Sequence, residues 1–538
     1  MRIENITIVG GGTSGWMAAA MLQCQHKGKI NVTLVESKST PSVGVGESTI
    51  IIFNSFLSAC GMKDEDWMSK CNATYKNNIR FVDFKEKGST LDYPFGGDRG
   101  SERVAYWSQL SAAYDLPDES YAEFCGTHNY FLSKHNKQTK NIHKVLDFNF
   151  NNETAYHFDA GLFADYLKNE ICTDVRHYYD DITSVDKDEN GYLKSVNGKI
   201  HGPYKADLFI DCTGFQSLLL EEEMGSEFLS FKPWLSNDKA LATHLPYKNK
   251  EEELTNSTTC TAIDNGWVYN IPLWNNYGTG YVYSSDFVDD DRAYEEFKKH
   301  LGVDELEIEN KIDIRHGVRK NAWVKNVVGI GLSYAFVEPL ESTSLVSTIT
   351  CLDRLSELMV QYDYKTTPFI IDGYNYACQV EMCNYRDFIG LHYKLSHRND
   401  TPYWRYQTEE REWFNIDESK FYEFHRPDSV GLNAYNSLQF HVNMGHNWLV
   451  LPGQGDGLYH IMAGMGYRPF GKQFYDNYVV AQAENREEAE KNLERLYDQF
   501  KEDTKDAEKY VLTQQSSCQF LREHIYGCLL YTSPSPRD

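Results

Sequence analysis

The segment ITIVGGGTSG, Ile6 to Gly15, decides the fold of this chain of 538 residues. The apolar run Ile6–Val9 enters a glycine turn, and a helical pattern follows from Trp16 to about Gln25. A second apolar run, Val32–Val35, ends in the acidic residue Glu36. Strand, helix and strand in this order form a βαβ unit, so we predict an α/β fold that begins with a nucleotide-binding motif.

The glycines of this turn have the GxGxxG spacing in the context that gives the motif its meaning. Gly10 permits the tight turn, Gly12 lets the backbone approach a pyrophosphate at the helix N-terminus, and Gly15 allows close packing of the helix. The carboxylate at the end of the second strand would accept hydrogen bonds from a ribose. The predicted cofactor-binding residues of this unit are Gly10, Gly11, Gly12, Thr13, Ser14, Gly15 and Glu36.

Two later segments favour FAD over NAD as the cofactor. Both KADLFIDCTGF (Lys205–Phe215) and VVGIGLSYAFVEPLEST (Val327–Thr343) place a strand before a glycine turn, as FAD-binding folds do where a returning chain covers the flavin. No second GxGxxG follows a strand, so no NAD(P)H domain is evident. We predict a Rossmann-like FAD-binding fold of the flavin monooxygenase type, joined to a mainly helical substrate module.

Composition and charge narrow the possible partners and the compartment. The net charge of -25 argues against nucleic acid or an anionic membrane as a partner, because phosphates would be repelled. No run of 18 apolar residues occurs, and the chain opens on a strand rather than a signal peptide. Its 12 cysteines form no CxxC pair, and no HExxH spacing is present, so we expect no metal site, no disulfide framework and a cytoplasmic location.

The predicted organisation has three parts. Residues 1–365 form the FAD-binding domain, with 87–149 as an irregular insertion near the substrate site. Residues 366–525 form the helical substrate module, in which Glu484–Lys509 is one charged surface helix. Residues 526–538 are a disordered or artefactual tail, because CLLYTSPSPRD resembles a cloning scar.

The segment GWVYNIP, Gly266–Pro272, resembles the GWxWxIP signature of flavin-dependent halogenases of the tryptophan-halogenase type. Tyr269 stands where the second Trp of that signature is usual. The resemblance reaches to about Tyr467 and includes GVGEST (Gly44–Thr49), WMSKCNATYK (Trp67–Lys76), HFDAGLFADYL (His157–Leu167), GTGYVYSS (Gly278–Ser285), FVEPLEST (Phe336–Thr343) and DTPYWR (Asp400–Arg405).

This resemblance implies a halogenase that uses reduced FAD, O2 and chloride, bromide or iodide to make hypohalous acid. In such enzymes the bulky segment that contains Trp267 and Tyr269 lies near the flavin and keeps organic substrates away from it. A separate flavin reductase would supply the reduced cofactor. The flavin-binding set then also includes Glu47, Ser48, Ile182 and Leu345.

The resemblance also assigns roles around the EPLEST turn. Backbone N–H groups of Thr343 and Ser344, at the start of a helix, would bind the halide, and Ser344 replaces the usual Gly. Lys76 matches the indispensable lysine, which would guide hypohalous acid either through a hydrogen bond or, if neutral, as a haloamine. Glu341 matches the carboxylate near that lysine and would either orient the partner of Lys76 or take the proton from the substituted ring. Glu338 is interpreted as structural.

The expected substrate is an indole or another electron-rich aromatic, but not free tryptophan. Phe95 would stack on the substrate ring, yet it follows Pro94 in DYPF, where tryptophan-specific members carry a His. The segment GLYHIMAGMG (Gly457–Gly466) keeps Tyr459 but not the family's Tyr-rich pattern. Two alternatives remain open, a flavin monooxygenase that oxygenates its substrate directly and a non-enzymatic FAD-carrying interaction protein. A homo-oligomer is also possible.

Overall fold

A six-stranded sheet carries the N-terminal glycine turn. The computed structural model describes residues 2–38, 47–96, 107, 110–111, 113–140, 149–411, 455–466 and 485–527. The strand order is β21-β22-β13-β1-β2-β9, with every pair parallel except β21 with β22. The bounds are β1 Asn5–Val9, β2 Asn31–Glu36, β9 Arg176–Tyr179, β13 Leu208–Asp211, β21 Trp323–Val324 and β22 Val327–Gly329.

Helix α1, Thr13–Gln25, follows β1 directly and is buried along most of its length. Its three alanines, Ala18 to Ala20, are fully buried, because small side chains let the helix lie close to the sheet and to α10. The predicted βαβ unit is therefore present, with β1 and β2 in parallel register from Asn5 opposite Asn31 to Val9 opposite Val35.

A seven-stranded sheet forms the second layer and carries the GWVYNIP segment as strand β17. Its order is β19-β15-β18-β17-β16-β5-β6, and all pairs are antiparallel except β16 with β5. The bounds are β5 Asn78–Val82, β6 Thr90–Pro94, β15 Lys239–Leu245, β16 Ser257–Ile263, β17 Gly266–Pro272, β18 Tyr277–Tyr283 and β19 Asn310–Asp313.

A small sheet of order β3-β8-β4 joins three distant motifs. Its strands are β3 Glu47–Ser48, β8 Ala155–Phe158 and β4 Thr74–Lys76. Ser48 and Thr74 both pair with His157, from opposite sides of β8. The GVGEST, HFDAGLFADYL and CNATYK segments thus meet at one place although they are far apart in the sequence.

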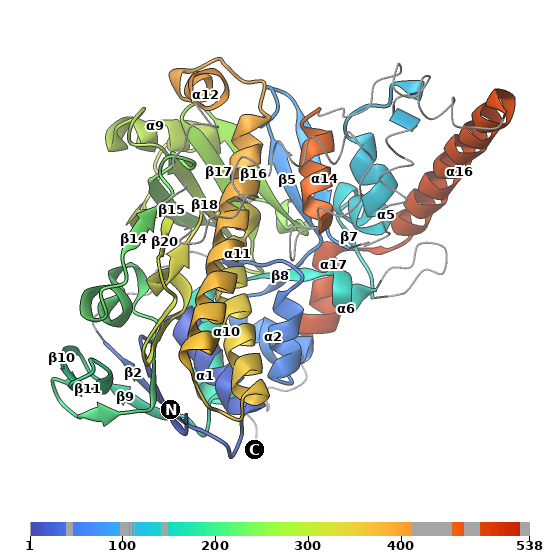
Figure 1. The fold of residues 1–538 in the computed structure, drawn as a ribbon. Coiled ribbons are helices and arrows are strands. Elements are labelled where there is room, and N and C mark those ends of the chain that lie inside the picture. Colours follow the sequence, from blue (N-terminus) through green and yellow to red (C-terminus); the bar gives the residue numbers. More distant parts are fainter. Residues whose placement is uncertain are drawn as a thin grey trace, which may run out of the picture.

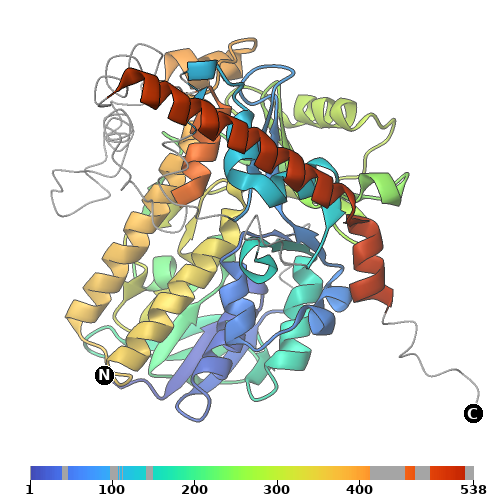
Figure 2. The ribbon, with the colours of Figure 1, turned by 90° about the vertical axis from the view of Figure 1, so that its right-hand side faces the viewer.

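Helices α10 (Thr343–Gln361) and α11 (Pro368–Lys394) run side by side in both ribbon views (Figures 1 and 2). The sulfur atoms of Cys351 and Cys378 lie 3.7 Å apart between them. The boundary predicted between residues 365 and 366 lies in the turn that joins these helices, so the two proposed modules share one helical layer. The ten described cysteines are all free.

The prediction that 87–149 is irregular is wrong for its described part. Strand β6 lies there, followed by the 15-residue helix α5, Ser120–Lys134, and by strand β7, Lys137–Gln138. Helix α5 packs against α16, Arg486–Leu512, where the ring centroids of Phe124 and Phe500 are 4.8 Å apart. Because α5 packs against a helix that is distant in the sequence, the contacts that bury it cannot be seen in its local sequence pattern.

The predicted tail begins too early. Tyr526 stacks on Trp274 with ring centroids 4.0 Å apart, and its hydroxyl donates to the carbonyl of Ala73 at 2.8 Å. Residues 528–538 lie outside the described part. Within that part, no helix is both long and apolar enough to cross a bilayer.

Further helices and strands are α2 Phe53–Ala59, α7 Ala160–Tyr166, β10 Ile182–Lys187, β11 Leu193–Gly198, α9 Asp290–Leu301, α12 Pro402–Arg405, α14 Gly455–Gly464 and α17 Ser517–Leu521.

Candidate active site

The glycine turn has the geometry that its sequence predicts. Gly10 has φ +110°, and a Cβ there would lie 2.2 Å from the carbonyl oxygen of Cys212. A Cβ on Gly15 would lie 1.9 Å from the carbonyl oxygen of Gly10, so any larger residue would push α1 away. At Gly12 a Cβ would meet no protein atom within 4 Å, which leaves the backbone open to a ligand beside the N-terminus of α1.

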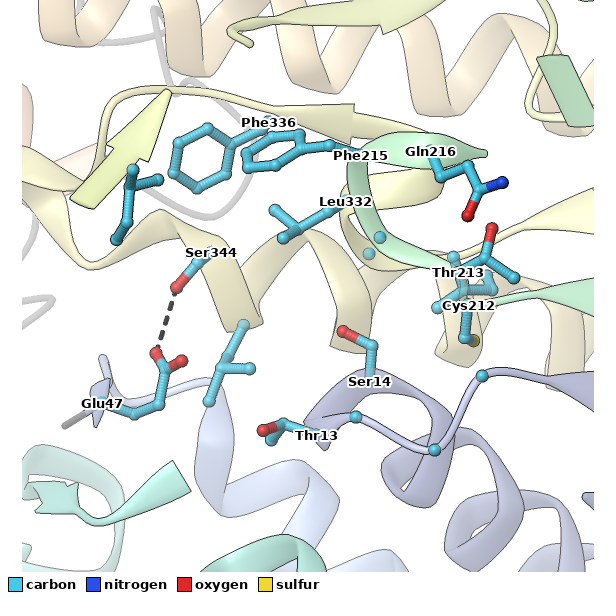
Figure 3. A pocket seen from close by; sticks show the side chains of 18 of the residues that line it. Thr13, Ser14, Glu47, Cys212, Thr213, Phe215, Gln216, Leu332, Phe336 and Ser344 are labelled. Atoms are coloured by element: carbon cyan, nitrogen blue, oxygen red, sulfur yellow. Dashed lines mark hydrogen bonds between the residues drawn. The ribbon is translucent and has the colours of Figure 1, made fainter. Parts of the chain in front are cut away.

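A cavity of about 800 Å³ extends from this turn between the two large sheets. Figure 3 shows Thr13 and Ser14 at the start of α1 on one side, with Phe215, Leu332 and Phe336 on the other. Among the residues predicted from sequence, the lining contains Gly10, Gly11, Gly12, Thr13, Ser14, Glu36, Glu47, Ser48, Ile182, Tyr269, Ser344 and Leu345.

The cavity fits a flavin dinucleotide. Its volume lies within the range of cofactor sites, and it combines an open glycine turn and a helix N-terminus with an apolar end. Apolar lining comes from the second sheet, through Ala240, Ile271, Val282, Ile312 and Ile314. The glycine turn would hold the pyrophosphate, and this apolar end would enclose the ring system.

Glu36 ends β2 at the mouth of the cavity, where the GxGxxG pattern predicts a ribose partner. Its Oε1 lies 2.7 Å from Nε2 of His177 and 3.4 Å from Nζ of Lys168. These two neighbours hold the carboxylate beside Gly11, where a Cβ would meet Glu36 Oε2 at 1.7 Å. Sequence reasoning did not identify His177 or Lys168.

A second turn, which follows β13, also lines the cavity and was only partly foreseen. Asp211 accepts hydrogen bonds from the backbone N–H groups of Thr213 (2.9 Å), Leu219 and Leu220 (both 2.8 Å). This buried carboxylate thus fixes the turn that presents Thr213, Phe215 and Gln216 to the cavity. The segment KADLFIDCTGF was the available signal, although its individual residues were not predicted as site residues.

Trp267 and Tyr269 lie on the same face of β17, but only Tyr269 lines the cavity. Tyr269 is paired across the sheet with Gly280, where a Cβ would be 2.4 Å from the Tyr hydroxyl. The indole N–H of buried Trp267 donates to Glu338 Oε1. Glu338 also accepts from Asn237 at 2.6 Å, so the geometry agrees with the structural interpretation of Glu338.

The first turn of α10 reaches the cavity from the other side of the flavin site. Ser342 has left-handed φ and ψ of 57° and 37°, and the helix begins at Thr343. As first residues of a helix, Thr343 and Ser344 have N–H groups with no acceptor within the helix. Thr343 is buried and does not line the cavity, whereas Ser344 does, and its hydroxyl donates to Glu47 Oε2 at 3.2 Å (Figure 3).

Glu47 is half-buried and lines the cavity. Burial raises the pKa of Glu47 to about 7, and the hydrogen bond from Ser344 opposes this only in part. The carboxyl therefore changes charge near neutral pH at the place where the resemblance predicts a halide.

Lys76 is fully buried on β4, just outside the cavity wall. Its Nζ donates to the carbonyl oxygen of Thr49 and to the hydroxyl of Ser342, both at 2.8 Å. The ring of Phe95 lies with its centroid 5.0 Å from Nζ. Burial lowers the pKa of Lys76 to about 7, although the charge of Glu341 raises it in part. Thr49 and Ser342 were missed by sequence reasoning, although both lie within motifs that it used.

Glu341 lies close enough to influence Lys76, but its carboxylate is paired elsewhere. Its Oε1 is 2.7 Å from Nε2 of His392, and both side chains are buried. His392, on α11, was not predicted, because nothing in the sequence marks one histidine of a long aromatic helix. Tyr459 belongs to α14, but its side chain lies outside the described part. Among the described residues, no group of three His, Cys, Asp or Glu is placed to hold a metal.

Comparisons with known proteins point to one family. The profile described as tryptophan halogenase matches residues 5–427. Tryptophan 7-halogenase RebH of Lentzea aerocolonigenes is 35% identical over 429 residues, which are 76% of this chain and 80% of RebH. Tryptophan 6-halogenase SttH of Streptomyces toxytricini is 34% identical over 421 residues, 75% of this chain and 80% of SttH.

Solved structures resemble the whole fold. The apo structure of VirX1 has a TM-score of 0.88 and 40% identity, and covers 98% of this chain and 100% of that one. BrvH, a flavin-dependent halogenase from Brevundimonas sp. BAL3, has a TM-score of 0.78 and 30% identity, with 97% and 99% covered.

Proposed function

This chain belongs to the tryptophan halogenase family of flavin-dependent enzymes, which use FADH2, O2 and a halide, and we propose that it halogenates an electron-rich aromatic ring other than that of free tryptophan. Reduced FAD, when bound, together with O2 supplies the two-electron oxidation that converts a halide into hypohalous acid. The chain's own residues hold the cofactor, bind the halide and carry the oxidant to the substrate.

Holding the cofactor is the task of the glycine turn and of Glu36. We infer that the N–H groups at the start of α1 bind the pyrophosphate and that Glu36 accepts from a ribose hydroxyl. Glu47, Ser48, Ile182 and Leu345 then line the inner part of the cavity. Tyr269 closes this part with its ring, which keeps an organic substrate from the flavin position.

The burial of Lys76 carries the proposal. A surface lysine needs no burial, whereas Nζ is here enclosed between Thr49, Ser342 and the ring of Phe95. Among the described residues, two of its three N–H donors have acceptors, which leaves the third for hypohalous acid. Ser342 also lines the cavity, so Lys76 is one hydrogen bond from the wall of the cofactor site.

The substrate would lie between Lys76 and Glu341. Electrophilic substitution needs only a nucleophilic ring beside the oxidant and a base for the ring proton. We infer that Glu341, held by His392, is this base. Relatives named for tryptophan differ in the ring position that their names specify, so an indole is a reasonable class. Pro94 in DYPF and the altered GLYHIMAGMG segment argue against free tryptophan.

The test is a product analysis. The protein is incubated with FAD, NADH, a separate flavin reductase, a halide salt and a panel of indoles, phenols and free tryptophan, and products are identified by mass. We expect a halogenated indole or phenol and no halogenated tryptophan. A product that gains oxygen but no halogen in the presence of bromide would instead support the monooxygenase alternative. The non-enzymatic alternative conflicts with membership of this enzyme family.

A further inference from the structure

A chain of buried hydrogen bonds connects Lys76 to His157 along the cofactor cavity. Lys76 Nζ is 2.8 Å from Ser342 Oγ, which is 3.0 Å from Ser48 Oγ. Ser48 Oγ is 2.7 Å from Thr258 Oγ1, which is 2.8 Å from Nε2 of His157. We call these five residues the hydroxyl chain. The small sheet β3-β8-β4, strand β16 of the seven-stranded sheet and the turn before α10 contribute to it, and its three hydroxyl residues line the cavity.

The direction of every hydrogen bond in the chain follows from a single carbonyl group. Thr74 Oγ1 is 2.6 Å from the carbonyl oxygen of Pro272, and a carbonyl can only accept, so the Thr74 hydroxyl donates there. The other contact of this oxygen is Nδ1 of His157 at 3.1 Å. Because the single Thr74 proton is already used, Nδ1 of His157 must carry the proton and donate to Thr74.

The tautomer of His157 then sets the rest of the chain. A neutral imidazole with its proton on Nδ1 has an accepting Nε2, so the Thr258 hydroxyl donates to it. Thr258 Oγ1 accepts from Ser48, and Ser48 Oγ accepts from Ser342. Ser342 Oγ accepts from Lys76, which can only donate. All donors therefore point from the ammonium group toward His157.

Burial of this chain limits the charge that its two ends can carry. Lys76 and His157 are fully buried, and the three hydroxyl residues are nearly so. Two cations in such an interior repel each other strongly. Burial first, and then the charge of Lys76, lower the pKa of His157 well below its usual value. The interior thus favours a single positive charge at the two ends of the chain, and the low pKa of His157 keeps this charge on Lys76 at rest, so that His157 takes the proton only transiently.

Other groups around Lys76 offer no equally direct exit for its proton. The carbonyl oxygen of Thr49 accepts a hydrogen bond but has no proton to pass on. Cys260 and Glu341 act on the amine by charge, and the Glu341 carboxylate is already paired with His392. The described structure thus gives the ammonium one continuous path of hydroxyl groups.

We propose that the hydroxyl chain moves a proton from the Lys76 ammonium to Nε2 of His157, so that Lys76 presents a free amine to hypohalous acid. One N–H bond of Lys76 breaks, each hydroxyl passes on its own proton and gains one, and an N–H bond forms on His157. The Ser342 hydroxyl then donates to the new lone pair of Nζ, so rotation about the Cε–Nζ bond must turn this lone pair toward hypohalous acid. The net charge is unchanged, and no oxidant is needed. His157 is a positioning residue in this scheme, and the inference rests on the function proposed above.

A first experiment tests the chain in the cofactor-free protein, independently of activity. Histidine labelled with nitrogen-15 reports by NMR which ring nitrogen carries the proton, and His157→Gln identifies the signal of His157. We expect the neutral form protonated at Nδ1. In Thr74→Val the proton should no longer be confined to Nδ1, because the hydroxyl that accepts from Nδ1 is gone. Lys76→Met should raise the pKa of His157, because the nearby cation is removed. A wild-type His157 protonated at Nε2 would overturn the proposal.

A second experiment tests proton transfer in the enzyme. Single-turnover halogenation by protein loaded with FADH2 is measured against pH in wild type, Thr258→Val and Thr258→Ser. Loss of a positioned proton-transfer group costs on the order of 100-fold, so we expect a loss of this size at pH 7 in Thr258→Val. Thr258→Ser keeps the hydroxyl and should recover most of the rate. Flavin fluorescence checks that FAD is bound.

The outcomes separate the two proposals. Equal rates for Thr258→Val and Thr258→Ser, with FAD bound, would overturn proton transfer through the hydroxyl chain. If Thr258→Val binds FAD poorly, Thr74→Val replaces it, because Thr74 does not line the cavity. Absence of halogenated product from the wild-type protein across the aromatic panel would refute the proposed function, and the NMR result would still decide the direction of the chain.

Discussion

Glu341 is held by His392, since Oε1 of the carboxylate lies 2.7 Å from Nε2 of the imidazole and both groups are buried. The two residues come from the turn before α10 and from the last part of α11. Packing of these helices therefore fixes the carboxylate that we infer to act as the base.

Replacement of His392 should reduce both stability and activity. Leaving a buried carboxyl group without its hydrogen-bond partner costs roughly 2 kcal/mol, so His392→Ala should lower the thermal unfolding midpoint. His392→Gln places an amide N–H near the position of Nε2 and should lose less. Halogenation rates should fall in the same order, because Glu341 loses its fixed orientation. Wild-type rates in a destabilised His392→Ala would contradict the role given to this pair.

The effect of Lys76 on the free energy of unfolding should depend on pH. Its pKa is lowered to about 7 in the folded protein, whereas an unfolded lysine titrates near its usual value of about 10.4. Between these values the unfolded state binds more protons, so stability rises with pH across this window. Below pH 7 the buried, charged ammonium group destabilises the folded protein by its full amount, on the order of 5 kcal/mol.

Lys76→Met removes this titration without leaving a large cavity. We expect Lys76→Met to be more stable than wild type at pH 7, by a margin that shrinks as pH is raised to 9.5. Thermal unfolding of both proteins at the two pH values measures the margin. Lys70→Ala, which changes an exposed lysine, is the matched control and should show no such trend. A margin that is independent of pH would contradict the lowered pKa.

Sequence alone revealed what is local and missed what depends on long-range packing. Gly10, Gly12 and Gly15 lie within one turn, so their spacing was sufficient to predict the backbone geometry of that turn. Lys76 and Glu341 could be proposed as site residues because each lies in a recognisable motif. His392 and the partners of Lys76 could not be predicted, because two helices and a small sheet bring them together from distant segments. Helix α5 was missed for the same reason, since α16 orders it.

The contact between Tyr269 and Gly280 makes a prediction about cofactor binding. A Cβ at Gly280 would lie 2.4 Å from the Tyr269 hydroxyl and 2.5 Å from its Cζ, so Gly280→Ala must displace a ring that lines the cavity. We expect FAD affinity to fall by at least about tenfold, which corresponds to a loss of 1.4 kcal/mol. Fluorescence titration with FAD measures it.

Gly373→Ala is a suitable control, because a Cβ on this helical glycine meets no atom within 4 Å. Its FAD affinity should equal that of wild type. The double variant Gly280→Ala/Tyr269→Val removes the ring and should restore part of the affinity. Unchanged binding in Gly280→Ala would show that the Tyr ring does not limit the cofactor site.

The pair Ser344 and Glu47 predicts how halide use depends on pH. The hydroxyl of Ser344 donates to Glu47 Oε2 at 3.2 Å, beside the N–H groups proposed to bind the halide. Burial raises the pKa of Glu47 to about 7, so the carboxyl is neutral below this pH and negative above it. A carboxylate repels a halide, and each pH unit above 7 should therefore raise the KM for bromide, by up to about tenfold.

Glu47→Gln keeps the size and a hydrogen-bonding group but cannot ionise. In this variant the KM for bromide should stay nearly constant between pH 6 and 8.5, while in wild type it should rise. Ser344→Gly removes the hydroxyl that partly stabilises the carboxylate, so its KM should begin to rise at a higher pH than in wild type. A rise in KM that persists unchanged in Glu47→Gln would place the responsible group elsewhere and would refute a halide site beside Glu47.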